Sequence, residues 1–248
     1  MHQTLFYSLI SVIGVSLVSL IGIIAIGIKQ EKLRKILIYM ISFSAGALFG
    51  DAFIHLLPEI SKNGFQFSYS VYILSGILLF FCMEKFIHWR HCHMPITSRH
   101  VHPFAYMNLI GDGLHNFIDG LIIVASYIVS IPVGIATSLA VLLHEIPQEI
   151  GDFGVLLYAG FSKAKATMLN FFTALTAVFG VLFGFLLSQF VENIEIPLIG
   201  LAIGGFIYIA GSDLIPELHK ETEIGISLLQ IVSFILGVLV MAVLLLLE

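Results

Sequence analysis

Eight apolar runs follow one another along the chain, separated by short polar segments. They cover roughly residues 4–28, 36–57, 68–88, 104–129, 132–159, 164–190, 196–215 and 224–247. A helix needs about 20 apolar residues to cross a bilayer. None of the runs alternates apolar and polar positions as the strands of a membrane barrel do. The pattern therefore predicts an all-α integral membrane protein with eight transmembrane helices.

Composition leaves little room for anything outside the bilayer. Of the 248 residues, 58% are hydrophobic and 11% are charged, and mean hydropathy is +1.04. A soluble domain carries roughly 25% charged residues. We therefore expect residues 1–248 to form one transmembrane domain, with the lipid bilayer as partner and no nucleic-acid partner. The first run lacks a basic segment and a cleavage motif, so it is expected to be a retained helix rather than a signal peptide.

Basic residues predict the orientation. The even loops contain only Lys62, and the odd loops and their edges contain Lys29, Lys32, Arg34, Lys35, Lys85, Arg90, Arg99, Lys163, Lys165 and Lys220. Lys and Arg concentrate on the cytoplasmic side of membrane proteins. The odd loops are therefore expected in the cytoplasm and both termini outside.

Residues 46–59 and 204–217 echo each other at the ends of the second and seventh predicted helices. Five of fourteen positions are identical when the two segments are aligned without gaps: Gly46/Gly204, Ala52/Ala210, Leu56/Leu214, Pro58/Pro216 and Glu59/Glu217. Because these helices run in opposite directions, the echo favours an inverted repeat, as in many secondary transporters. It predicts a 3+2+3 bundle, with repeats at 1–90 and 164–248 around a central pair at 104–159. Chance similarity between apolar helices is the alternative.

Two polar stretches, 112–120 and 144–152, stand inside the central pair. Residues three or four apart share a helix face. One stripe is thus Asp112, His115, Asn116 and Asp119, and the facing helix offers His144, Gln148 and Asp152 beside Glu145 and Glu149. At 1.5 Å per residue, His115 and His144 each lie about 17 Å from the surface where their helix enters, near the midplane.

The chemistry of these stretches points to a metal. No Lys or Arg occurs between Arg99 and Lys163, so buried carboxylates there are costly unless protonated or metal-bound. Histidine with carboxylate is a ligand set for divalent transition metals. A structural polar network and a proton pathway are the alternatives. Pro147 should free a carbonyl near Leu143 for a water or an ion, and the glycines of both stretches should let the two helices approach closely.

At these residues the sequence resembles the ZIP (Zrt-, Irt-like protein) family of divalent metal transporters. That family has His-Asn-x-x-Asp/Glu-Gly on its fourth helix, here residues 115–120, and His-Glu-x-Pro-His/Glu/Gln on its fifth, here 144–148. The resemblance implies an eight-helix bundle that moves zinc and related metals into the cytoplasm through a central, often binuclear site, frequently as a homodimer. By motif position, one metal would use His115, Asp119, His144 and Gln148. A second would use Asn116 and Glu145, with Asp119 as a bridge.

Gln148 departs from relatives that have histidine there. An amide oxygen is a weaker donor that suits harder metals or fast release, so Fe²⁺, Mn²⁺ and Cd²⁺ stand beside Zn²⁺ as substrates. No organic cofactor is expected.

Further polar residues are candidates for the metal pathway. Asp51, His55 and Glu59 are placed toward the outside, and Asp112, Asp152 and Asp213 toward the inner exit. Glu149 is a further candidate for the pathway. Asn170 is expected to add a polar contact to the site. Solvated helix caps are the alternative for the outer group. The loop between the third and fourth helices is a candidate metal-binding loop or merely a polar one, with His88, His91, Cys92, His93, His100 and His102.

An intramembrane zinc metalloprotease is the main competing function, with His144 and Glu145 in a His-Glu-x-x-His motif. Gln148 replaces the second histidine, and Pro147 disturbs the helix that the motif needs. A proton-coupled carrier for an organic substrate and a metal sensor fit the ligand-rich sequence less well. The sequence therefore predicts a secondary transporter and not an enzyme, and its short loops favour a prokaryotic inner membrane.

Overall fold

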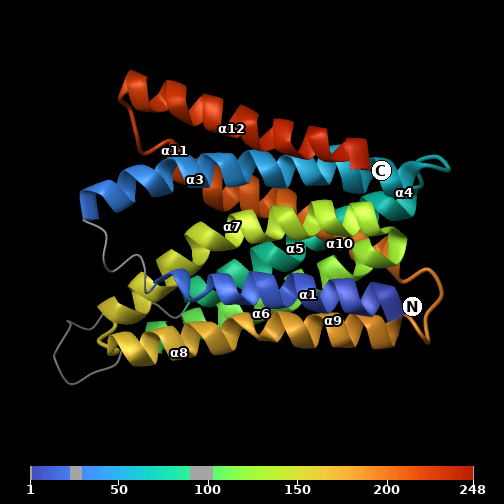
Figure 1. Cartoon of the computed structure of the whole chain (residues 1–248), viewed down its shortest axis with the longest axis horizontal. Coiled ribbons are helices and arrows are strands. Elements are labelled where there is room, and N and C mark those ends of the chain that lie inside the picture. Colours follow the sequence, from blue (N-terminus) through green and yellow to red (C-terminus); the bar gives the residue numbers. More distant parts are fainter. Residues whose placement is uncertain (1, 23–29, 90–102, 248) are drawn as a thin grey trace.

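The computed structural model describes residues 2–22, 30–89 and 103–247, and every regular element in these ranges is a helix (Figure 1). Seven helical segments are long and apolar enough to cross a membrane: Lys35–Ser61, Phe67–Lys85, Asn108–Val129, Ile131–Leu157, Lys163–Leu187, Glu195–Leu218 and Ile224–Leu244. The first helix, α1 (His2–Val18), is shorter. The predictions of an all-helical, membrane-embedded protein are confirmed.

Four predicted helices agree with the structure to within a few residues. They are α5 (Phe67–Trp89), α6 (Pro103–Val129), α7 (Ile131–Tyr158) and α12 (Ile224–Leu244), the last followed by a 3₁₀ turn, η3 (Leu245–Leu247). The helix predicted over 4–28 is different, because α1 ends at Val18 in a turn. There the hydroxyl of Ser19 donates to the carbonyl of Ser16, and residues 23–29 lie outside the described ranges.

The second and seventh predicted helices each contain a π-helix. The second consists of α3 (Gln30–Gly50), η1 (Asp51–Leu56) and α4 (Leu57–Ser61). The seventh consists of α10 (Glu195–Tyr208), η2 (Ile209–Leu214) and α11 (Ile215–Leu218). The predicted ends at 57 and 215 were wrong, because Pro58 and Pro216 stand in the first turn after each π-helix, where proline is tolerated. Both π-helices occupy equivalent positions in the two segments that echo each other.

The sixth predicted helix, 164–190, is interrupted and ends early. It forms α8 (Lys163–Ala174) and α9 (Thr176–Leu187), which meet at Leu175. The hydroxyl of Thr173 donates to the carbonyl of Asn170 at 2.8 Å, and that of Thr176 donates to the carbonyl of Thr173 at 2.6 Å. Such bonds from side chain to backbone compete with the helical ladder and bend helices.

Glycines bring two pairs of helices into backbone contact. A Cβ added at Gly46 of α3 would lie 2.1 Å from the carbonyl oxygen of Phe234 on α12. A Cβ at Gly204 of α10 would lie 2.0 Å from the carbonyl oxygen of Ile73 on α5. Small residues allow such close approach between membrane helices. The segments 46–59 and 204–217 thus pack against their neighbouring helices through glycines at equivalent positions.

The glycines of the polar stretches do not pack as the sequence predicted. A Cβ at Gly120 of α6 would lie 2.0 Å from the carbonyl oxygen of Ala177, and one at Gly180 would lie 2.0 Å from that of Phe117. Gly151 of α7 has nothing within 4 Å of such a Cβ. The close approach is therefore between α6 and α9, and the expectation that these glycines join the two central helices was wrong. Polar side chains occupy the space between α6 and α7 instead.

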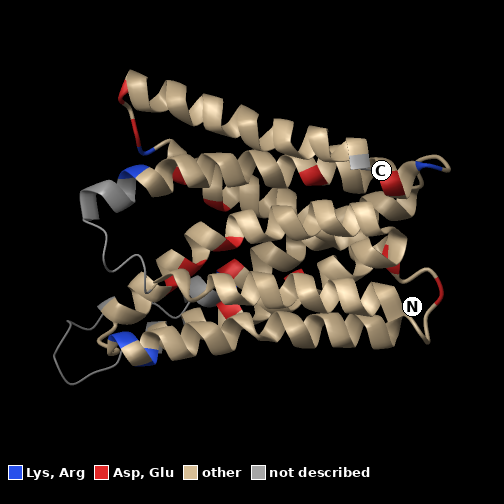
Figure 2. Cartoon of the chain, viewed as in Figure 1, with Lys and Arg blue, Asp and Glu red and all other residues tan. Residues whose placement is uncertain are grey.

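Most basic residues of the described chain lie at one end of the bundle. Figure 2 shows Lys and Arg where α3 and α8 begin and where α11 joins α12, whereas the loop after α4 lies at the opposite end. That loop contains Lys62, the one basic residue outside the predicted cytoplasmic group. We call the end with α11 the basic end.

Candidate metal site

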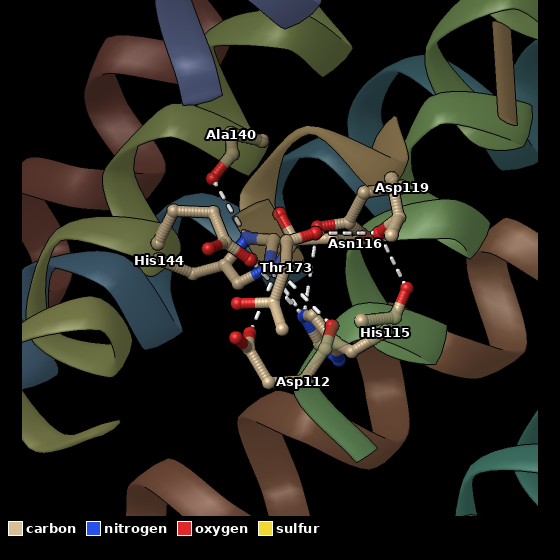
Figure 3. Close-up of polar contacts among 10 residues, drawn as sticks. Asp112, His115, Asn116, Asp119, Ala140, His144 and Thr173 are labelled. Carbon is tan, nitrogen blue, oxygen red and sulfur yellow. Dashed lines mark hydrogen bonds and ion pairs between the residues drawn. The ribbon is translucent and has the colours of Figure 1, made fainter. Parts of the chain in front are cut away.

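Two histidines from the central helices meet in the interior of the bundle. The Nε2 atoms of His115 on α6 and His144 on α7 lie 3.2 Å apart (Figure 3). The same two nitrogens contact Asp119 Oδ2 at 3.5 and 3.3 Å and Glu145 Oε1 at 3.2 and 3.5 Å. These four residues each offer one donor atom, and the four atoms lie within 4.8 Å of one another. The structure thus joins two imidazoles and two carboxylates at one point.

This cluster is almost completely buried, and its two carboxylates have no Lys or Arg of the described chain beside them. Asp119 and Glu145 are fully buried, and His144 and His115 are 1% and 8% exposed. Apart from the imidazoles, no described group donates a hydrogen bond to either carboxylate. The ion pairs Lys62–Glu59 and Lys220–Glu217 involve exposed lysines and are not part of this cluster. Burying the two carboxylates of this cluster is costly without a cation or protons to balance their charge.

Neighbouring groups hold the imidazoles in place. His144 Nδ1 lies 3.2 Å from the carbonyl oxygen of Ala140. A proton on Nδ1 would donate to that oxygen and leave the Nε2 lone pair directed at the cluster, as in many metal-binding histidines. The rings of Phe80 and Phe206 pack edge-on against His115 and His144, with centroids 5.7 and 6.1 Å away.

Asn116 lies beside the cluster with its amide nitrogen already engaged. Its Nδ2 donates to Asp112 Oδ1 at 2.8 Å and to the Asp112 carbonyl at 3.1 Å. Its Oδ1 is buried and accepts no hydrogen bond from the described residues. Because the oxygen is the atom that binds metals, the arrangement leaves Asn116 able to act as a ligand. That role remains a prediction.

A cavity of about 480 Å³ reaches His115 and Gln148 from the basic end. Its position follows from its lining, which includes the last turns of α5 and α7, the first turns of α6, and α11. The acidic residues that line it are Glu84, Asp112, Asp152, Asp213 and Glu217. Three predicted inner residues, Asp112, Asp152 and Asp213, are thus brought together around one cavity. Glu84 and Glu217 were not predicted from the sequence.

Two polar contacts at this cavity were also missed. Asn108 Nδ2 donates to Asp152 Oδ1 at 2.8 Å, and the Tyr208 hydroxyl donates to Glu84 Oε2. Asn108 stands four residues before Asp112, so extending the polar stripe by one helical turn would have found it. Tyr208 gives no comparable signal, because nothing in the sequence indicates which tyrosines face the interior.

Glu149 does not lie among the residues that line this cavity. It is buried, and its Oε2 accepts a hydrogen bond of 2.5 Å from Asn170 Nδ2 on α8. The same nitrogen lies 3.5 Å from the carbonyl oxygen of Ser19. The contact expected from Asn170 is therefore made with Glu149, and it joins α7 to α8.

The residues predicted near the outside lie apart from the four-residue cluster. Asp51 and His55 are buried in η1, and His55 Nε2 lies 2.8 Å from the carbonyl oxygen of Met241 on α12. Glu59 forms an ion pair with Lys62. These residues are not part of the four-residue cluster, and their role in collecting metal remains a prediction. His91, Cys92, His93, His100 and His102 lie outside the described residues, as does the side chain of His88.

Pro147 remains inside α7, and the carbonyl that it frees has a protein partner. The hydroxyl of Ser44 on α3 donates to the Leu143 carbonyl oxygen at 2.6 Å. The sequence left a water or an ion as the partner of this carbonyl, so a neighbouring helix was not anticipated.

Comparisons with known proteins identify the family of the chain. The family model described as ZIP Zinc transporter matches residues 95–245. Zinc transporter ZIP13 of Mus musculus is 32% identical over 256 residues, covering 86% of this chain and 70% of that protein. Zinc transporter ZIP13 of Danio rerio is 31% identical over 305 residues, covering 96% and 86%. Zinc transporter zipt-7.1 of Caenorhabditis briggsae is 30% identical over 311 residues, covering 98% and 79%.

These matches also bear on the competing predictions. The family consists of transporters, so the prediction that the chain is not an enzyme is confirmed, and a metalloprotease finds no support. The three relatives come from animals and lend no support to a prokaryotic inner membrane. The family match extends over more than half of the chain, and the relatives over most of it. This multi-pass membrane protein therefore belongs to the ZIP zinc transporter family of metal transporters.

Proposed function

We propose that the chain carries divalent metal ions, zinc foremost, into the cytoplasm through a site between α6 and α7. The observation that carries this proposal is the buried cluster of His115, Asp119, His144 and Glu145. Gln148 would be a further ligand on the cavity side, because it lines the same cavity as His115. Iron and manganese are secondary substrates, because an amide oxygen also accepts harder ions. Cadmium is a third secondary substrate, because the two imidazoles also bind softer ions.

The spacing of the donor atoms supports zinc as substrate. In a tetrahedral site with zinc about 2.0–2.1 Å from its ligands, neighbouring donors lie about 3.3 Å apart. The five distances that join each imidazole nitrogen to the other and to the two carboxylates lie between 3.2 and 3.5 Å. A zinc ion would fit among these four atoms with little rearrangement.

A second metal would bind next to the first, with Asn116 Oδ1, Glu145 and a bridging Asp119. The support is that Asn116 Oδ1 and the second carboxylate oxygens of both acids, Asp119 Oδ1 and Glu145 Oε2, are buried without a hydrogen-bond donor among the described residues. Such oxygens are satisfied when a cation binds.

The inward direction rests on the position of the acidic cavity. The cavity opens at the basic end, which the distribution of Lys and Arg assigns to the cytoplasm. Metal would enter from the opposite end, bind at the cluster and leave past Asp112, Asp152 and Asp213 as one set of helices rocks or slides against the other. Nothing resembling a nucleotide-binding loop occurs in the sequence, so the metal gradient or a coupled ion would drive transport.

The proposed architecture has eight membrane helices in a 3+2+3 arrangement, with parts at 1–90, 104–159 and 164–248 of one transporter domain. The matching π-helices η1 and η2 support an inverted repeat. Both chain ends lie at the end opposite the basic one in Figure 1, which supports termini outside the cell. The family resemblance further suggests a homodimer.

Uptake by proteoliposomes tests the site. We expect His115→Ala and His144→Ala each to abolish saturable zinc uptake, while His2→Ala, at the exposed start of α1, serves as the control and retains it. Wild-type rates in both cluster variants would rule the site out. Competition by iron, manganese and cadmium in the same assay ranks the substrates.

A further inference from the structure

The helix that contributes His144, Glu145 and Gln148 also contains a proline between them. Pro147 has no backbone N–H, so the carbonyl of Leu143, four residues earlier, loses its helical donor. Inside a membrane a carbonyl without a donor is expensive, because no lipid group can replace the bond. Ser44 of α3 supplies the donor at 2.6 Å, and its side chain is only 1% exposed.

This hydrogen bond acts at the metal site and comes from outside the helices that form it. Leu143 directly precedes His144, whose Nε2 belongs to the donor cluster. α3 packs mainly against α12, whereas α7 packs mainly against α6 and, to equal extents, against α1 and α3. The bond thus fixes the turn of α7 that contains His144 against a helix that contributes no residue to the four-residue cluster.

Ser42 provides a natural comparison on the same helix. Its hydroxyl also donates a buried bond of 2.6 Å to a carbonyl of a neighbouring helix, that of Gln230 on α12. Four residues after Gln230 stands Phe234, which has a backbone N–H, within an uninterrupted helix. The bond from Ser42 is therefore additional to the helical ladder, whereas the bond from Ser44 replaces one that the ladder lacks.

We propose that Ser44 is a positioning residue for metal binding: its hydroxyl takes the place of the absent Pro147 N–H and holds the His144 turn in the geometry that the metal requires. The proposal rests on the proposed function, because it assumes that His144 is a ligand. Metal sites tolerate displacements of only about 0.2 Å in ligand distance. A turn released from α3 would therefore bind metal less tightly even if the bundle still folds.

The test compares zinc affinity and melting temperature of the purified full chain in detergent for five variants. They are Ser44→Ala, Ser42→Ala, Pro147→Ala, the double variant Ser44→Ala/Pro147→Ala, and His144→Ala. We expect Ser44→Ala to weaken zinc binding about tenfold, equivalent to about 1.4 kcal/mol, and Ser42→Ala to change it less than about twofold. With alanine at position 147, the new backbone N–H donates to the Leu143 carbonyl. Adding Ser44→Ala to this variant should therefore weaken zinc binding no further.

Two results would overturn the proposal. One is that Ser44→Ala and Ser42→Ala bind zinc equally well. The other is that Ser44→Ala has the same effect with proline and with alanine at position 147. If Pro147→Ala alone abolishes zinc binding, melting temperature replaces zinc affinity in this comparison. Ser44→Ala should then lower the melting temperature with proline at position 147 and should not lower it further with alanine there. Failure of the proposed function is recognised separately, because His144→Ala would then keep wild-type zinc affinity.

Discussion

Gly120→Ala should weaken metal binding although residue 120 is not a ligand. Gly120 follows Asp119 directly in α6, at the point where α6 crosses α9. An added Cβ would lie 2.0 Å from the carbonyl oxygen of Ala177, and real Cβ atoms essentially never come closer than 3.0 Å. The two backbones would have to separate by about 1 Å, since a packed crossing has no flexible side chain to give way.

The size of the effect follows from two opposing contributions. Overpacking costs about 1–3 kcal/mol, whereas replacing glycine by alanine within a helix gains up to about 1 kcal/mol. We expect a net destabilisation of about 1 kcal/mol and a protein that still folds. A shift of about 1 Å at Asp119 far exceeds the tolerance of a metal site of about 0.2 Å, so zinc affinity should fall more than about tenfold.

Gly113→Ala is the matched control on the same helix. Its added Cβ would meet the methyl groups of Thr173 and Thr176 at 3.7 Å, which is an ordinary contact. Zinc affinity should remain as in the wild type, and the melting temperature should stay equal or rise. Both quantities are measured on purified protein, by titration calorimetry and by thermal unfolding. Equal zinc affinity in the two variants would refute the argument that the α6–α9 crossing determines the position of Asp119.

Three substitutions and one change of condition give further predictions. Gln148→His should raise zinc affinity and reduce competition by manganese, because imidazole is a softer donor; unchanged competition in uptake assays would mean that residue 148 is not a ligand. Asn170→Leu should lower the free energy of unfolding by about 1–3 kcal/mol, because it removes the donor to Glu149, and an unchanged melting curve would contradict this. Asp152→Asn should lower the maximal rate of uptake with little change in KM, since Asp152 lines the cavity that we propose as the exit; a change in KM alone would place it elsewhere on the pathway. Zinc uptake should fall below about pH 6, because protons compete with metal for histidine and carboxylate ligands, and a rate independent of pH would exclude these ligands.

Helix positions were predictable from the sequence because bilayer thickness imposes a length on apolar runs. The bounds of α5, α6 and α7 agree with the prediction because polar or turn-forming residues flank them. Hydropathy contains no information about hydrogen-bond register, so neither the π-helices nor the break at Leu175 was visible. For the same reason the sequence did not show that the helices continue past Pro58 and Pro216.

At the site, spacing and depth were enough to bring His115 and His144 together, because both quantities follow from the rise per residue. The rotation of each helix about its axis could not be derived from the rise per residue. Lipid-facing and protein-facing sides of these helices are both apolar, so the sequence does not distinguish them. This is why the packing of Gly120 against α9 and the bond from Ser44 to Leu143 appear only in the structure.

The π-helices add a point about the history of the chain. A π turn contains one residue more than an α turn and is explained most simply by a one-residue insertion into an α-helix. Such an insertion rotates all that follows by about 100° around the helix axis, the angle of one residue at 3.6 per turn. η1 and η2 lie at equivalent positions of segments 46–59 and 204–217. If the two segments descend from one duplicated ancestor, the insertion is older than the duplication, and the ancestral half-protein already had this rotated end before it acquired a partner of opposite orientation.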